Sequence, residues 1–124
     1  MTREFSVLSV DDSAAMLSII SVYLRGSEFN VVATAQDGAR AIELVQDLKP
    51  QLILLDLVMP GLSGHETLQH ILDVRPDSVV AIVSSLGFDD GVQECLAAGA
   101  KDYLQKPFSK EDLLQFLRNL VAKP

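Results

Sequence analysis

The sequence predicts an α/β fold in which five β-α units form one open parallel sheet with helices on both faces. Two observations support this prediction. Short apolar runs and helical patterns alternate along all 124 residues, and two of the runs, Leu52–Leu55 and Val79–Val83, are apolar without interruption. Uninterrupted runs of this kind are typical of strands in a sheet that is covered on both faces. The length fits one domain, and 48% hydrophobic residues are enough for its core.

Strands and helices follow one another strictly along the chain. The predicted strands are short and rich in apolar or β-branched residues: Phe5–Val10, Asn30–Ala35, Leu52–Leu55, Val79–Val83 and Tyr103–Gln105. The predicted helices carry apolar residues at helical spacing: Ala14–Leu24, Ala39–Leu48, His65–Val74, Gly91–Ala98 and Glu111–Val121. No linker, repeat or low-complexity segment interrupts them, so we expect residues 1–124 to form a single domain.

Helix-terminating residues support these boundaries. Ser13 and Ser109 precede the first and last helices and can cap them through a side-chain oxygen. Pro50 and Pro76 follow the second and third helices, where a helix cannot continue. Gly99 follows the fourth helix and is expected as its C-cap.

Apolar spacing predicts which side of each helix is buried. In the second helix the expected buried face is formed by Ala41, Ile42, Val45 and Leu48. In the last helix it is formed by Leu113, Leu117 and Leu120. The first helix contains more apolar residues than one buried face needs, namely Met16, Leu17, Ile19, Ile20, Val22, Tyr23 and Leu24.

Charge and cysteine content exclude several classes of protein. The chain has 17 acidic and 10 basic residues, a net charge of −7, and no Lys/Arg cluster, so direct nucleic-acid binding is not expected. No apolar stretch approaches the roughly 20 residues of a membrane-spanning helix, so no membrane insertion is expected. The N-terminal residues show no secretory signal, and the one cysteine excludes an intrachain disulfide. These features predict a cytoplasmic protein.

Charged residues follow three of the predicted strands. Asp11 and Asp12 come after the first strand, Asp56 after the third and Lys106 after the fifth. Because the carboxyl ends of parallel strands gather at one edge of the sheet, we expect these groups to converge. Three carboxylates and one ammonium at one point are unfavourable unless a cation and a phosphate bind there.

In these motifs the chain resembles the response regulator receiver domains of bacterial two-component signalling. The matching elements are Asp11-Asp12, Asp56, Met59-Pro60-Gly61, Ser84 and Lys106-Pro107-Phe108. The resemblance covers the whole chain and implies a flavodoxin-like, doubly wound (βα)5 sheet with strand order 2-1-3-4-5. The length of 124 residues favours a stand-alone, chemotaxis-type regulator. The alternative is a receiver domain excised from a longer DNA-binding or enzymatic regulator.

The resemblance implies a phosphoacceptor switch in a phosphorelay. Asp56 would accept a phosphoryl group from the phosphohistidine of a sensor histidine kinase or histidine phosphotransfer protein. Asp12, Asp56 and the backbone carbonyl of Val58 would bind Mg²⁺ directly and Asp11 through water, with Mn²⁺ as a substitute. Such a protein is a signalling protein rather than an enzyme, and it catalyses only its own phosphorylation and slow dephosphorylation.

The same resemblance implies roles for three further side chains. Ser84 would donate its hydroxyl to the phosphoryl group, and Lys106, aimed by a cis bond to Pro107, would pair with a phosphoryl oxygen. Ser85 is the rival hydroxyl, but alternation along a strand lets only one of the two serines reach the phosphate. Tyr103 would rotate inward and change the face around the last two helices, where an unidentified output partner binds. We expect a monomer, or a dimer that forms on phosphorylation.

Two apolar positions predict a long-lived aspartyl phosphate. Val58 and Leu86 flank the expected path of the attacking water, and relatives that dephosphorylate quickly often carry polar groups there. Apolar side chains cannot orient that water.

Other functions fit the sequence less well. A receiver fold that serves only as a phosphorylation-independent interaction module would lack Asp56, Lys106 or the acidic pair. A phosphatase of the haloacid dehalogenase type would need a second acid at position 58, which is valine. A dinucleotide enzyme would need a glycine-rich turn after the first strand.

The remaining candidate residues are expected to be structural or to contact partners. We expect His65 and His70 on the surface and Cys95 in the core. The surplus apolar residues of the first helix predict either extra core contact or a docking patch for the phosphodonor, for which receivers use this helix. We expect Phe116 either to be exposed as part of the output surface or to pack at the rim of the core.

Overall fold

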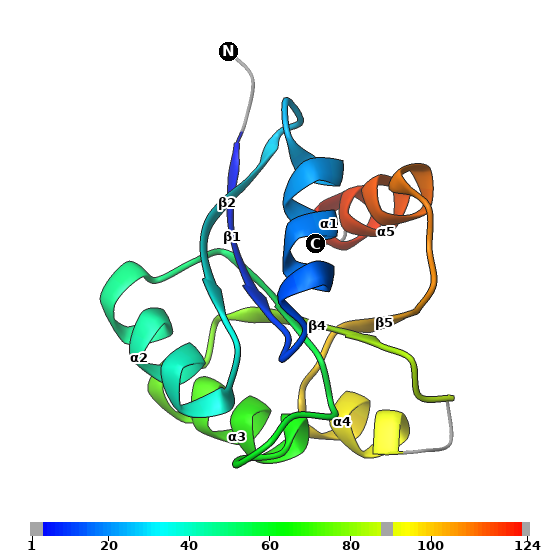
Figure 1. Cartoon of the computed structure of the whole chain (residues 1–124). Helices are drawn as coiled ribbons and strands as arrows, with labels where there is room; N and C mark the ends of the chain where they lie inside the picture. Colours follow the sequence, from blue (N-terminus) through cyan, green and yellow to red (C-terminus); the bar gives the residue numbers. More distant parts are fainter. Residues whose placement is uncertain (1–3, 88–90, 123–124) are drawn as a thin grey trace.

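The computed structural model describes residues 4–87 and 91–122, which form a five-stranded parallel sheet between two layers of helices (Figure 1). The strands are β1 (Phe5–Val10), β2 (Phe29–Ala35), β3 (Leu52–Leu55), β4 (Val79–Ser84) and β5 (Asp102–Gln105). The helices are α1 (Ala14–Leu24), α2 (Gly38–Leu48), α3 (Gly64–Val74), α4 (Gln93–Ala98) and α5 (Lys110–Ala122). The strand order is β2-β1-β3-β4-β5, and all neighbouring strands are parallel. The predicted fold class and strand order are confirmed.

Each face of the sheet has its own core. Helices α1 and α5 cover one face, and α2, α3 and α4 cover the other (Figure 1). The residues of β3 alternate between the two cores, with Leu52 and Leu54 on the α1–α5 side and Ile53 and Leu55 on the opposite side. This is why the strand is apolar throughout. The predicted buried face of α5 is confirmed, because none of its three residues is more than 7% exposed: Leu113, Leu117 and Leu120.

Strand β2 forms one edge of the sheet and contains a bulge. Val7 of β1 is opposite Val31, but Leu8 is opposite Ala33, so Val32 is an extra residue on β2. Val31 packs on the α1–α5 side and Ala33 on the other side. A bulge interrupts regular pairing, and on an edge strand it hinders the addition of another strand.

The predicted helix caps are confirmed. Ser13 Oγ accepts a hydrogen bond from Met16 N at 3.1 Å, and Ser109 Oγ accepts one from Asp112 N at 3.0 Å. Gly99 ends α4 with a φ of 125°, which glycine adopts without a steric penalty.

Several predicted helix boundaries are wrong by one or two residues. Helices α2 and α3 each begin one residue earlier than expected, at Gly38 and Gly64, because Asp37 and Ser63 cap their N-termini. These caps outweigh the low helix propensity of glycine. Helix α4 begins at Gln93, two residues later than expected, because Gly91 and Val92 form a π-helical turn before it.

One predicted core position on α2 is also wrong. Leu48 is 46% exposed and Ile42 is only partly buried, whereas Leu44 is buried together with Ala41 and Val45. The buried face of α2 therefore ends at Val45. Leu48 is the last residue of the helix, lies beyond that face and is exposed.

The other apolar predictions have clear outcomes. Cys95 is buried, His70 is exposed and His65 is partly exposed, as expected. On α1, Ile19 and Val22 are 40% and 53% exposed, so extra core contact does not explain these two residues. Phe116 is partly buried against the α1–α5 core, as expected of a rim residue.

Within residues 4–87 and 91–122 no helix is long and apolar enough to cross a membrane.

Candidate functional site

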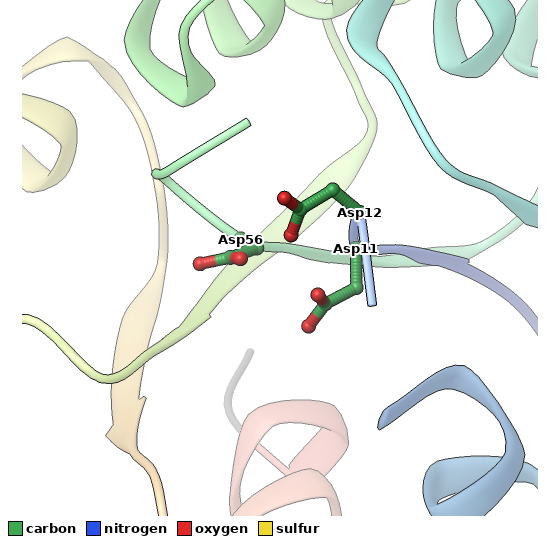
Figure 2. A group of neighbouring side chains, drawn as sticks. All are labelled: Asp11, Asp12 and Asp56. Carbon is green, nitrogen blue, oxygen red and sulfur yellow. The ribbon is translucent and has the colours of Figure 1, made fainter. Parts of the chain in front are cut away.

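Three carboxylates meet where the central strands β1 and β3 end (Figure 2). Asp11 and Asp12 directly follow β1, and Asp56 directly follows β3. One oxygen from each carboxylate lies within 4.8 Å of the other two. Asp11 and Asp56 are only 2% and 6% exposed, whereas Asp12 is open to solvent. The cluster is therefore a mostly buried acidic site with one accessible side.

The ammonium of Lys106 reaches this cluster from the end of β5. Its Nζ lies 2.6 Å from Asp11 Oδ2 and 3.6 Å from Asp56 Oδ2. The backbone N–H of Lys106 donates to the carbonyl of Ser84 at 2.9 Å, which fixes the end of β5 against β4. The cis bond between Lys106 and Pro107 is present, as predicted. One cation thus contacts two of the three carboxylates.

The electrostatics of the site favour an additional cation. Burial raises the pKa of Asp56 above its ordinary value, and the charge of Asp11 raises it further, while Lys106 lowers it. Hydrogen bonds from the Ser84 hydroxyl and the Val58 amide also lower the Asp56 pKa, but they do not outweigh burial. Three carboxylates face one ammonium, and hard divalent cations such as Mg²⁺ prefer carboxylate oxygens. These residues therefore fit a divalent cation.

Ser84 and Ser85 differ in position. Ser84 is fully buried at the end of β4, contacts Asp56 and accepts a hydrogen bond from the N–H of Leu86 at 3.3 Å. Ser85 is exposed, as expected from alternation along the strand. Of these two serines, Ser84 is the one beside the carboxylate cluster.

Tyr103 connects β5 to the segment that follows Ser84. Its ring is partly buried against the core on the α2–α4 side, and its hydroxyl donates to the carbonyl of Leu86. Since the N–H of Leu86 donates to Ser84, one residue links the tyrosine to the serine at the site. Val58 follows Asp56 by two positions and is 55% exposed, and its N–H donates to Asp56 Oδ1 at 3.4 Å.

Two contacts at the site were missed by the sequence analysis. Gly64, the first residue of α3, donates its N–H to the carbonyl of Leu57 at 3.1 Å, and a Cβ there would lie 2.7 Å from the carbonyl oxygen of Asp56. A glycine directly after the capping Ser63 was the available signal. Gln36 donates from Nε2 to the backbone carbonyl of Asp12 at 3.3 Å, and no local pattern indicates that contact.

Comparisons with known proteins agree with this geometry. The chemotaxis protein CheY of Listeria monocytogenes is 34% identical over 111 residues, covering 90% of this chain and 93% of that protein. The DNA-binding response regulator MtrA of Mycobacterium bovis is 37% identical, and the match covers 94% of this chain but 50% of MtrA.

Structural similarity and a family match point the same way. The solved CheX–CheY–BeF3–Mg²⁺ complex from Borrelia burgdorferi contains a chain that superposes with a TM-score of 0.91 at 29% identity, covering 98% of this chain and 92% of that one. The sequence of residues 7–118 matches the response regulator receiver domain. This protein therefore belongs to the response regulator receiver domain family.

Proposed function

We propose that residues 1–124 form a phosphoacceptor switch of a two-component phosphorelay in the cytoplasm, with Asp56 as the phosphoacceptor. The observation that supports this most is the convergence of Asp56 with Asp11, Asp12 and the Lys106 ammonium. The donor would be the phosphohistidine of a sensor histidine kinase or a histidine phosphotransfer protein. No direct contact with nucleic acid is expected, because the chain has a net charge of −7 and no Lys/Arg cluster.

Phosphoryl transfer at this site depends on position and charge. An Asp56 oxygen attacks the phosphorus, a P–O bond forms, and the P–N bond to the donor histidine breaks. Lys106 is held 2.6 Å from Asp11 and 3.6 Å from Asp56, close enough to pair with an oxygen of the incoming phosphoryl group.

A divalent cation completes the proposed charge balance. Asp11, Asp12, Asp56 and the backbone carbonyl of Val58 would hold Mg²⁺, which when bound neutralises the charge of the phosphoryl oxygens. The Borrelia burgdorferi relative was solved with Mg²⁺, which supports this choice of ion. Mn²⁺, which also accepts oxygen ligands, would substitute for Mg²⁺.

The proposed switch begins at Ser84. A phosphoryl group on Asp56 accepts a hydrogen bond from the Ser84 hydroxyl, and movement of this hydroxyl toward the phosphate weakens the 3.3 Å bond that its oxygen accepts from the N–H of Leu86. Rearrangement of Leu86 then affects Tyr103, whose hydroxyl donates to the Leu86 carbonyl. The preferred arrangement of α4, β5 and α5 shifts as a result, and this is the face that an output partner would recognise. A monomer, or a dimer formed on phosphorylation, is compatible with this mechanism.

The surroundings of Asp56 suit a slowly hydrolysed aspartyl phosphate. The exposed side chain of Val58 and the partly buried side chain of Leu86 lie on the two segments beside Asp56. Neither side chain can accept a proton from water or orient it for attack.

A second arrangement is favoured by one comparison. Because the match to MtrA covers half of that protein, a receiver domain within a longer DNA-binding regulator is the second candidate. The full length of the gene distinguishes this arrangement from a stand-alone regulator.

The direct test is incubation with acetyl phosphate and Mg²⁺, followed by measurement of the intact mass. We expect one phosphoryl adduct in the wild type, and none in Asp56→Ala or when Mg²⁺ is chelated. A wild type without an adduct, or an adduct that persists in Asp56→Ala, would overturn the proposed function.

A further inference from the structure

A groove runs between α1 and the edge strand β2, on the β2 side of the helix. It has a volume of about 710 Å³, and Asp37 and Arg40 at the start of α2 also line it. A second hollow of about 490 Å³ continues it past the end of α1, and Ser21 and Arg25 line both. The groove therefore extends along the length of α1, which at 11 residues spans about 16 Å.

The groove carries positive charge on an otherwise acidic protein. Arg25 at the end of α1 and Arg40 on α2 both line it, whereas the chain as a whole has a net charge of −7. Among residues 4–87 and 91–122, the Arg25 guanidinium forms no ion pair. Arg40 has one distant partner, Glu43 at 3.9 Å, and both side chains are more than half exposed. Exposed pairs of this kind contribute little, so both arginines are available to an outside carboxylate.

One carboxylate of the chain also lines the groove. Asp37 caps α2, and its Oδ1 accepts the hydrogen bond of Arg40 N at 2.8 Å. A second, Glu4, lines the adjoining hollow rather than the groove itself. The two guanidinium groups therefore outnumber the carboxylate within the groove.

The same groove has apolar contacts to offer. Val22 lines it and is 53% exposed, and Leu17 and Ala35 form buried parts of its wall. The hydroxyl side chains of Ser18 and Thr34 also line it. An amphipathic ligand fits this lining better than a small anion does.

We propose that the α1–β2 groove binds an acidic amphipathic helix of a partner protein. The apolar side of that helix packs on Val22 and Leu17, and its carboxylates pair with Arg25 and Arg40. A helix suits the site better than an extended strand, because the bulge at Val32 hinders strand addition at the β2 edge. The surface lies on the opposite side of β1 from β5, so it is separate from the α4–β5–α5 face.

One contact connects the groove to the carboxylate cluster. Gln36 lines the groove and donates to the backbone carbonyl of Asp12 at 3.3 Å. A ligand that draws the Gln36 side chain away changes the support of Asp12.

Binding is tested on the full, unphosphorylated chain with a designed probe peptide. The probe is an acetylated and amidated helix of about 14 residues, with leucine along one side and glutamate along the other. We expect amide NMR shifts at Ser18, Arg25, Thr34 and Arg40, and binding that weakens with added salt. Arg25→Glu and Arg40→Glu should each weaken binding by about 5-fold or more. The matched charge reversal Lys101→Glu, at an exposed position outside the groove, should not.

Other outcomes overturn the proposal. One is the absence of binding at millimolar concentrations of the probe peptide. Another is amide NMR shifts confined to α4, β5 and α5. A third is a loss of probe affinity in Lys101→Glu equal to that in the arginine variants. Self-association of the protein that Arg25→Glu abolishes would assign the groove to a second copy of the chain instead. Arg25→Glu should leave the rate of phosphorylation by acetyl phosphate unchanged. A slower rate would place Arg25 in the phosphorylation machinery and also contradict the proposal.

Discussion

Replacing Gly64 with alanine tests how closely α3 approaches the loop that carries Asp56. The new Cβ would lie 2.4 Å from Leu57 Cα and 2.7 Å from the Asp56 carbonyl oxygen, whereas ordinary contacts begin at 3.4 Å. Both neighbouring atoms belong to the backbone, so no side-chain rotation relieves the clash. The helix and the loop must therefore separate by about 1 Å.

This separation affects both stability and phosphorylation. Overpacking of this kind costs about 1–3 kcal/mol, and we expect the free energy of unfolding to fall by that amount. The shift also moves Asp56 relative to Lys106, which now lies 3.6 Å away. A misplacement of about 1 Å can slow a reaction on the order of 100-fold, so we expect the rate of phosphorylation by acetyl phosphate to fall about 10- to 100-fold.

Urea denaturation measures the first effect and the time course of the intact mass measures the second. Gly26→Ala is the matched control, because Gly26 has a φ of 80° and nothing within 4 Å of an added Cβ. It should cost about 1 kcal/mol through backbone strain alone and leave the rate unchanged. Wild-type stability and rate in Gly64→Ala, or equal slowing in both variants, would refute the reasoning.

Three further predictions concern the lifetime of the phosphate and the charged groups. The double mutant Val58→Asn/Leu86→Glu should lose its phosphoryl group about 10- to 100-fold faster, because polar side chains there can orient water; decay of the intact-mass adduct measures this. Arg118→Met removes a two-fold hydrogen-bonded pair with Glu28, at 2.9 Å for each bond, and should lower the free energy of unfolding at neutral pH only slightly. Arg118 holds the pKa of Glu28 below its ordinary value, so this contribution is complete above that ordinary value and is lost as the pH falls through the lowered one. Asp56→Asn should stabilise the metal-free protein at neutral pH, because burial raises the pKa of Asp56; the gain should shrink as the pH falls through the raised pKa, as urea denaturation in a chelator would measure.

Each of these predictions has an outcome that contradicts it. An unchanged or slower decay in the double mutant would remove the explanation for a long-lived phosphate. A loss of stability in Arg118→Met that persists where Glu28 is protonated would mean that packing, not the ion pair, is responsible. A destabilised Asp56→Asn would show that the ionised carboxylate is well compensated without a metal.

Local patterns carry enough information to predict the fold and the centre of the site. Continuous apolar runs such as Leu52–Leu55 mark strands that are covered on both sides, and in a parallel sheet the residues after such strands must gather at one edge. Asp11 and Asp56 therefore meet although 45 positions separate them, and Lys106 reaches both. Ser13 and Ser109 fix the starts of their helices through hydrogen bonds to backbone N–H groups only three residues further along the chain.

Features that depend on how the elements pack were not predictable in this way. Glu28 and Arg118 are 90 positions apart, and their pairing requires α5 to lie beside the end of α1. Gly64 resembles any glycine near a helix start until α3 is packed against Leu57. Leu48 continues the apolar spacing of α2, but the core it would face ends one turn earlier. Helical spacing identifies the side of a helix that is buried but not how far the neighbouring layer extends.

Locating the phosphoryl group tests the central claim most directly. Reduction with borohydride converts an aspartyl phosphate to homoserine, and peptide sequencing by tandem mass spectrometry then identifies the position. The proposed mechanism predicts homoserine at position 56 alone after incubation with acetyl phosphate and Mg²⁺, because Asp56 is the buried carboxylate beside both Lys106 and Ser84. Homoserine at position 11 or 12, with Asp56 intact, would contradict it.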